Sequence, residues 1–266
     1  MHGLSRRTSR SGRRRSVRTS ERKSYVICTT ARSGSNLLCD YLDQTGIFGR
    51  PAEFLNPEVV VNGAYDRRFG KGPAVSVGEY IDWLYDNMST GNQVFGIKIL
   101  YEDFVAYRGF PRFQKLIEDS ALFYLSRNSK IRQAISYYVA QNTGQWMADD
   151  RARISSDDLP YDYAAIDDNM QMLSHQHIEW QVFLSSIDRP VVMIEYEQLV
   201  KSPFDVIAEI GHALDIDVGD VRLAENVRHQ RTPATDRLLA RYKEDLRKFY
   251  YGLTAEAPYE GLLLKP

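Results

Sequence analysis

A short run of arginine, serine and glycine follows the first apolar stretch of the chain. Residues 24–30 have the composition of a buried strand, and the next residues lead directly into an apolar helical pattern. A turn of this kind binds anions, because Gly34 permits close backbone approach and the first amides of the helix point toward the ligand. Arg32 adds a positive charge, and Ser33 and Ser35 add hydroxyl donors. We expect a phosphate or sulfate group here.

The turn is not a Walker A loop. The G-x-x-x-x-G-K-[ST] spacing is absent, and with it the hydroxyl after Lys that binds Mg²⁺ in ATPases and kinases. An ordinary turn between a strand and a helix also favours Gly and Ser. The pattern alone therefore leaves a purely structural role open.

A second polar cluster follows a later strand. Residues 122–125 are apolar, and beyond Ser126 comes Arg127, followed by a helical pattern that contains Ser136. In a doubly wound fold, ligand contacts gather beyond the carboxyl ends of the strands, where Arg127 would stand. Taken alone, Arg127 also fits a surface ion pair, and Ser136 a bond to its own helix backbone. Together with the Arg32 turn, they indicate a second anion contact.

The elements that would position these residues alternate along the chain. Strands are predicted at residues 24–30, 93–100, 120–126 and 190–196, and helices at residues 35–45, 129–142, 164–186, 203–214 and 235–250. Ser76 and Glu79 form a capping box for a further helix, and Ser202 with Pro203 opens the helix at 203–214. Near-continuous apolar strands separated by helices predict an α/β fold with a mostly parallel sheet covered on both faces.

The charge of the chain is unevenly distributed. The net charge is −1, but residues 1–23 hold eight Arg, one Lys and one Glu, which leaves −9 for residues 24–266. The leader has no apolar periodicity, so residues 1–23 are predicted to be a disordered basic leader and residues 24–266 the folded domain. An organellar transit peptide has a similar composition. The acidic body argues against a nucleic-acid-binding surface.

The lengths of the apolar runs and the positions of Cys and His residues indicate the cellular compartment and whether a metal is bound. No apolar run approaches the roughly 20 residues of a membrane-spanning helix, so no membrane association is expected. Cys28 and Cys39 are the only cysteines, and they form neither a disulfide framework nor a metal site. His175 and His177 are two positions apart in a predicted helix and point to different faces. A cytoplasmic protein without a metal is predicted.

Four motifs occur in an order that a known enzyme family shares. They are R-S-G-S-x-L-L from Arg32, P-x-E-F from Pro51, F-G-I-K from Phe95 and R-x₅-Q-A-x-S from Arg127. Over residues 24 to about 245, the chain resembles the trehalose 2-sulfotransferase family of bacterial carbohydrate sulfotransferases. These enzymes use 3′-phosphoadenosine 5′-phosphosulfate (PAPS). The resemblance implies a P-loop-like three-layer fold, with a central mostly parallel sheet flanked by helices.

The resemblance also implies a donor site. Carried over by position, the residues that hold the 5′-phosphosulfate are Arg32, Ser33, Gly34, Ser35 and Asn36. Arg127 and Ser136 would hold the 3′-phosphate, since a dianion favours a planar guanidinium together with a hydroxyl. Gln230 is the one residue carried over from the family's segment before its last helix, because this chain departs from the family on both sides of it. Residues 57–75 replace a region that helps to define the acceptor pocket.

Glu53 matches the family's catalytic glutamate. A glutamate is ionised at neutral pH, so it can take the proton of an attacking sugar hydroxyl. Arg32 would stabilise the charge that builds on the leaving phosphate oxygen, and no metal is then needed. Lys98, at the end of its strand, faces either the donor sulfate or the acceptor. The resemblance thus implies transfer from PAPS to a hydroxyl of a small carbohydrate, trehalose or a related glycan.

Two other functions stay open at this point. A nucleotide phosphotransferase with a non-standard phosphate loop would need Mg²⁺ and a carboxylate at a strand end, for which Glu195 is the candidate. A nucleic-acid-binding protein would use the basic leader instead of the folded domain. The expected partners of the sulfotransferase are the carbohydrate acceptor alone, with neither nucleic acid nor membrane; a homodimer is left open.

Overall fold

A parallel sheet of four strands forms the centre of the computed structural model, which describes residues 22–56, 76–147, 150–219, 221, 223 and 232–252. The strands are β1 (Lys23–Thr29), β2 (Val94–Leu100), β3 (Ala121–Ser126) and β4 (Val191–Glu195). They are hydrogen-bonded in the order β2-β1-β3-β4, and every pair is parallel. The predicted α/β fold with a parallel central sheet is confirmed.

The two faces of the sheet are both apolar, because successive residues of a strand point to opposite sides. On β1, Val26 and Cys28 belong to one core cluster, whereas Tyr25 and Ile27 belong to the other. Both clusters are closed to solvent, which explains why the strands are near-continuous apolar runs rather than alternating ones.

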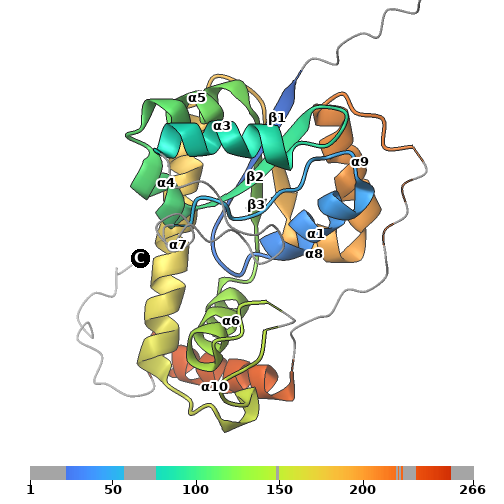
Figure 1. Ribbon diagram of the computed structural model, residues 1–266. Coiled ribbons are helices and arrows are strands. Elements are labelled where there is room, and N and C mark those ends of the chain that lie inside the picture. Colours follow the sequence, from blue (N-terminus) through green and yellow to red (C-terminus); the bar gives the residue numbers. More distant parts are fainter. Residues whose placement is uncertain are drawn as a thin grey trace, which may run out of the picture.

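Helices cover each face and complete the three layers (Figure 1). One face is packed by α3 (Val77–Met88), α4 (Tyr101–Tyr107), α5 (Pro111–Asp119) and the end of α7 (Tyr163–Ser185). The other face is packed by α1 (Ser35–Thr45) and α9 (Pro203–Ala213), and the short α8 (Tyr196–Lys201) leads from β4 into α9. The predicted three-layer arrangement follows from these contacts.

A third apolar cluster lies beyond the carboxyl ends of the strands. It joins α6 (Lys130–Thr143), the other half of α7 and α10 (Pro233–Tyr250), which Figure 1 shows below the sheet. The long helix α7 links the two parts, and its fully buried Trp180 donates its indole N–H to the carbonyl of Thr29 at 2.8 Å. This bond fixes the end of β1 to α7.

The ends of the four strands lie side by side. The register pairs Thr29 with both Leu100 and Leu125, and Ser126 with Glu195. The segments that leave these ends are the turn at residues 30–34, α4, the segment from Arg127 and α8. Residues far apart in the sequence therefore meet at one edge of the sheet, as expected for a doubly wound fold.

The predicted element boundaries agree with the structure to within about two residues, which is the usual uncertainty of element ends. The capping box of Ser76 and Glu79 is present, but Ser202 occupies the N-cap of α9 without a side-chain cap bond. Helices α4, α5 and α8 were not predicted. Among the described residues, no helix is both long and apolar enough to cross a membrane. Residues 1–21 and 57–75 lie outside the described residues, so a disordered leader stays a prediction for residues 1–21. The predicted boundary at residue 23 is wrong, because Lys23 is the first residue of β1 and Arg22 pairs with Asp86.

Candidate functional site

The turn between β1 and α1 has an unusual backbone conformation. Arg32 has φ 60° and Gly34 has φ 93°, so two residues of the turn lie in the left-handed region. Gly34 is the N-cap of α1 and makes no side-chain cap bond, which leaves the first-turn amides of α1 without a partner inside their own helix. The Ser33 side chain is fully buried, and its Oγ lies 2.6 Å from Oγ1 of Thr29. The Ser33 hydroxyl therefore braces the turn.

There is a second reason why position 34 needs a residue without a side chain. A Cβ atom built on Gly34 would lie 2.3 Å from Cδ2 of Tyr196, which is closer than a real contact allows. The Tyr196 ring, at the start of α8, thus packs directly on the turn. Because Gly34 has no side chain, the Tyr196 ring of the protein itself approaches the backbone closely at this position.

The side chain of Arg32 extends from the turn toward α6. Its Nε donates to Oγ of Ser136 at 3.0 Å, and its Nη1 donates to the carbonyl oxygen of Trp146 at 2.5 Å. Burial lowers the pKa of the Arg32 guanidinium to about 10, and the positive charge of Arg127 adds to this shift. The structure thus brings Arg32 and Ser136 into one hydrogen-bonded unit.

Arg127 stands directly after β3, next to the same turn. Its Nη1 donates to the carbonyl oxygen of Arg32 at 3.3 Å, and its guanidinium carbon lies 4.6 Å from the centre of the Tyr196 ring. Its Nε is buried and has no hydrogen-bond partner among the described residues. Burial lowers the pKa of Arg127 as well. The two partly buried arginines are close enough for the charge of Arg127 to lower the pKa of Arg32, so an anion bound between them would be favourable.

A glutamine holds α6 against the turn. The Gln133 side chain is fully buried, and its Nε2 donates to Oγ1 of Thr30 at 2.8 Å and to the carbonyl oxygen of Ala31 at 2.6 Å. Lys130, one turn earlier, donates to the carbonyl oxygen of Arg127 at 2.5 Å. These bonds fix the position of the helix that carries Ser136.

Lys98 and Glu53 form an ion pair on the other side of the turn. Lys98 Nζ lies 2.8 Å from Glu53 Oε2 and donates to Oδ1 of Asn36 at 2.7 Å. The Lys98 side chain is 5% exposed and that of Glu53 is 26% exposed. The other oxygen of Glu53, Oε1, accepts a bond from Asn56 Nδ2 at 2.9 Å. Lys98 therefore connects the predicted base to the predicted anion turn.

The net shift of the Lys98 pKa is upward. Burial by itself lowers this pKa, but the negative charge of Glu53 and the bond to it outweigh the effect of burial. Lys98 is therefore a cation at neutral pH, and its charge favours the ionised form of Glu53.

Asp103 is a buried acid beside this pair. It lies in the first turn of α4, is 2% exposed, and its Oδ2 accepts the backbone N–H of Leu100 at 3.3 Å. Burial raises the pKa of Asp103 to about 7, and the negative charge of Glu53 adds to the rise. The site thus holds a carboxyl group that titrates near neutral pH.

Comparison with known proteins shows the family to which the chain belongs. The family model described as Stf0 sulphotransferase matches residues 24–245, which is most of the chain. The chain belongs to the Stf0 sulphotransferase family. It is therefore an enzyme of the sulfotransferase type, and the alternatives of a nucleotide phosphotransferase and of a nucleic-acid-binding protein are not supported.

A solved sulfotransferase structure shares the fold of this Stf0 sulphotransferase. A sulfotransferase from Alicyclobacillus acidocaldarius has 16% sequence identity and a TM-score of 0.50, over 89% of this chain and 98% of that chain. The sulfotransferase STF9 from Mycobacterium avium has 12% identity and a TM-score of 0.42, over 85% of this chain and 68% of that chain. No curated protein sequence matches the chain.

Some candidates of the sequence analysis lie apart from the site or outside the described residues. Gln230 is outside them. Glu195, the candidate metal carboxylate, accepts a bond from Asn128 at 3.0 Å, and the described part of the Stf0 sulphotransferase holds no group of three or more metal-binding side chains. His177 lies 2.5 Å from the hydroxyl of Tyr124, on the side of α7 that faces the sheet.

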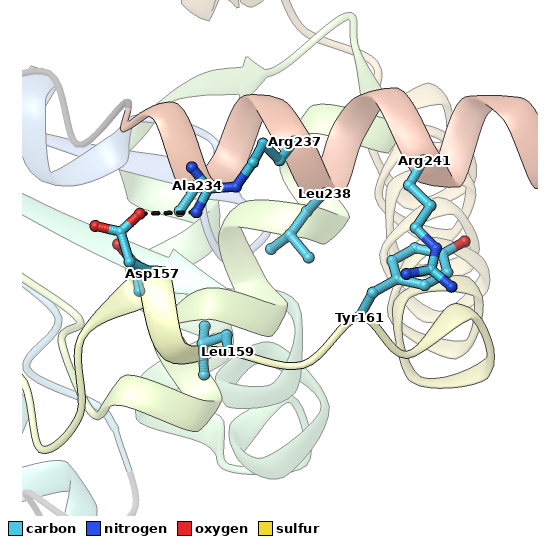
Figure 2. A pocket seen from close by; sticks show the side chains of 8 residues that line it. Asp157, Leu159, Tyr161, Ala234, Arg237, Leu238 and Arg241 are labelled. Carbon is cyan, nitrogen blue, oxygen red and sulfur yellow. Dashed lines mark hydrogen bonds and ion pairs between the residues drawn. The ribbon is translucent and has the colours of Figure 1, made fainter.

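The Stf0 sulphotransferase also has a cavity away from the turn. It has a volume of about 330 Å³ and lies between residues 156–161 and α10, where Figure 2 shows Arg237 paired with Asp157 and Arg241 over the ring of Tyr161. None of the predicted site residues lines it. Both arginines of this cavity have partners there.

Sequence reasoning missed four contributors to the site. Gln133 lies inside the R-x₅-Q-A-x-S motif, but neither Gln133 nor Tyr196 was given a role, and Asp103 lies in a helix that was not predicted. The position of Tyr196 immediately after a strand end was the available signal for one of them. The carbonyl contact of Trp146 had no signal in the sequence, because any residue type supplies a carbonyl.

Proposed function

We propose that this enzyme transfers a sulfuryl group from PAPS to a hydroxyl group of a small carbohydrate, trehalose or a related glycan. The observation that carries the proposal is the convergence of Arg32 and Arg127 on one glycine turn, with the Lys98–Glu53 pair on its other side. The first arrangement suits a donor with two phosphate positions. The second suits a hydroxyl acceptor.

The donor residues fit PAPS. Arg127 has a buried Nε that lacks a partner among the described residues, so a 3′-phosphate oxygen would satisfy it. Ser136 belongs to the same part of the site, because its hydroxyl accepts a hydrogen bond from Arg32. The amides of residues 33–36, together with the side chains of Ser35 and Asn36, would receive the 5′-phosphosulfate at the start of α1. Gln230 remains a prediction for the donor site.

PAPS, when bound, supplies the sulfuryl group and a phosphate leaving group. Glu53 is the proposed general base, because an ionised carboxylate accepts a proton and that of Glu53 lies 2.8 Å from the Lys98 ammonium beside the turn. Lys98 keeps Glu53 ionised before that proton arrives. Arg32 stabilises the negative charge on the leaving phosphate. These charges come from the protein, so we propose that no metal ion takes part.

Lys98 bonds both Glu53 and Asn36, so it fixes the distance between the base and the donor turn. A hydroxyl held by Glu53 is therefore presented to the group that the turn holds. Such positioning is a large part of catalysis in transfer reactions of this type.

The donor is tested by thermal shift with 3′-phosphoadenosine 5′-phosphate (PAP), the proposed product. At a hundredfold excess over Kd, PAP should stabilise the protein by about 2.7 kcal/mol, and ATP with Mg²⁺ should stabilise it much less. Arg127→Ala should weaken PAP binding by about 10- to 100-fold and spare binding of ADP, which lacks the 3′-phosphate. The matched control is Arg112→Ala, because Arg112 pairs with Asp82 outside the site.

Equal PAP affinity of Arg127→Ala and the wild type would refute the 3′-phosphate assignment. Stabilisation by ATP with Mg²⁺ as strong as that by PAP would refute PAPS as the donor. The acceptor is tested separately, by mass spectrometry of trehalose incubated with PAPS and the enzyme. A mass increase of one sulfuryl group is expected, and it should be absent with Glu53→Gln.

A further inference from the structure

The cavity between residues 156–161 and α10 has the size and the lining of a ligand site. Its volume of about 330 Å³ falls within the range of about 300–1,000 Å³ that small-molecule sites have. Leu159, Ala234 and Leu238 form its apolar lining, and none of them is more than 9% exposed. This lining favours a ligand with a hydrocarbon or aromatic part, because binding removes the apolar surface of both from water.

Two arginines of α10 lie at this cavity, four residues apart and therefore on one face of the helix. Figure 2 shows Arg237 and Arg241 on either side of Leu238, with their guanidinium groups directed toward the loop that carries Asp157 and Tyr161. Asp157 is the one carboxylate among the lining residues. Two positive charges against one negative charge leave the lining with a net charge of +1.

Arg241 has hydrogen-bond donors to offer a ligand. Its guanidinium carbon lies 4.3 Å from the centre of the Tyr161 ring, so the group meets the ring through its flat face. Its N–H groups lie in the guanidinium plane, and within the described part of the chain none of them donates a hydrogen bond. The neighbouring carboxylate of Asp245 is bonded to the Tyr161 hydroxyl at 2.7 Å and to Lys248 at 3.4 Å.

The ion pair of Arg237 competes only weakly with a ligand. Arg237 Nη2 lies 2.8 Å from Oδ1 of Asp157, but the two side chains are 62% and 63% exposed. Water screens an ion pair that is so exposed, and such a pair contributes little. Arg237 also has N–H donors beyond this one bond. It can therefore donate to a ligand while it stays paired with Asp157.

We propose that this cavity binds a small amphipathic anion, with a carboxylate or sulfate-type head group on an apolar body. Arg241 and Arg237 bond the head group, because a planar guanidinium matches two oxygens of such a group. The apolar body lies against Leu159 and Leu238. A cation is disfavoured by the net charge of the lining, and an inorganic anion lacks the apolar part. The site is separate from the glycine turn, since none of the proposed donor or acceptor residues lines it.

The test is isothermal titration calorimetry of the full chain with four probes, first without PAP and then with the protein saturated with PAP. 2-Naphthoate and naphthalene-2-sulfonate carry both parts of the ligand, and they distinguish a carboxylate from a sulfate-type head group. The probe 2-naphthamide has no charge, and acetate has no apolar body. One anionic probe at least should bind one per chain, about 10-fold or more tightly than 2-naphthamide and acetate, with PAP present or absent.

Two variants locate the bound probe. Arg241→Gln should weaken binding of the anionic probe by about 10-fold or more, because charge-assisted hydrogen bonds are lost. Asp157→Asn should strengthen binding, because the negative charge that competes for Arg237 is gone. The matched control is Arg247→Gln, since Arg247 is an exposed arginine of the same helix and does not line the cavity. All three substituted positions are exposed, so melting temperatures should stay close to that of the wild type.

Equal losses of affinity in Arg241→Gln and Arg247→Gln would overturn the inference, because binding would then follow the charge of the helix rather than the cavity. Displacement of the probe by PAP would overturn it as well, since the probe would then occupy the glycine turn. So would equal affinities for 2-naphthoate, naphthalene-2-sulfonate and 2-naphthamide, or no saturable binding of either anion. A protein that binds an anionic probe through Arg241 and does not bind PAP would support this inference and overturn the proposed donor, so the two can fail separately.

Discussion

Replacing Glu53 with Gln removes a charge that has two roles in the structure. Glu53 is the proposed base, and it is also the ion-pair partner of Lys98, whose side chain is only 5% exposed. The substitution should therefore change both turnover and stability. The two effects must be separated before a loss of activity can be assigned to proton transfer.

The stability effect can be bounded from the burial of the pair. Removing one partner of a fully buried pair costs about 3–5 kcal/mol, because an uncompensated charge remains in the interior. Glu53 is 26% exposed and Lys98 keeps its bond to Asn36, so the loss should be smaller, about 1–3 kcal/mol of unfolding free energy. Without Glu53, burial becomes the main influence on Lys98, and its pKa should fall.

The effect on turnover is larger. A general base contributes about 10²- to 10⁴-fold to a rate, so kcat of Glu53→Gln should fall by that factor. The matched variants are Lys98→Met and the double variant Glu53→Gln with Lys98→Met. In the double variant no buried charge is left unpaired, so stability should recover part of the loss while kcat stays low.

Urea denaturation gives the stabilities, and initial rates with saturating PAPS and trehalose give kcat. Recovery of kcat together with stability in the double variant would refute the role of Glu53 as the base, because that variant still lacks the carboxylate. Near-normal turnover of Glu53→Gln itself would refute it more directly. A double variant with recovered stability and low kcat is the expected result.

Four further outcomes are expected. Between about pH 4 and pH 7, Asp103 keeps its proton in the folded protein, whereas the unfolded chain loses it. The free energy of unfolding should therefore fall over this range by at most about 4 kcal/mol and level off above pH 7. Urea titrations of Asp103→Asn should lack this fall. Gly34→Ala should lower the melting temperature and PAP affinity together, because alanine there is strained by φ 93° and collides with the Tyr196 ring; an unchanged melting temperature would contradict this packing. Deletion of residues 1–21 should leave the melting temperature and the rate nearly unchanged, and a large fall in the melting temperature would show that the leader is part of the fold. Dialysis against EDTA should leave the rate unchanged, and recovery of a lost rate by added Mg²⁺ would contradict a mechanism without metal.

Most of the sheet and its long helices could be predicted from the sequence. The strands are apolar on both faces, so they stand out as continuous runs, and the long helices contain enough turns to show their periodicity. Helix α4 has only seven residues and begins immediately after β2, so it has neither a separating turn nor a full period. The unpredicted helix is nevertheless the one that carries Asp103.

The residue types of the site were visible in the sequence, but their pairings were not. Arg32 and Ser136 are 104 positions apart and bond each other, whereas the sequence analysis assigned them to different phosphates of the donor. The sequence analysis left open whether Lys98 faces the donor sulfate or the acceptor. In the structure, Lys98 contacts both Glu53 and Asn36. Such contacts depend on which strands are neighbours, and spacing along the chain does not encode that order.

The strand order itself explains how one site can hold the proposed base and a cluster of cations without their neutralising each other. β1 is central, with β2 on one side and β3 on the other, so the segments after β2 and β3 reach the glycine turn from opposite directions. Lys98 and Asp103 approach with β2 and α4, and Glu53 lies in the segment beside β2, where the carbonyl of Ala52 accepts the backbone N–H of Lys98 at 3.1 Å. Arg127 and Ser136 approach with β3 and α6. The carboxylates are therefore kept on the proposed acceptor side, where a proton would be removed, and the arginines on the proposed donor side, where negative charge would be stabilised. An ion pair between Glu53 and Arg127 would cancel both functions, and the position of β1 between the two strands prevents it.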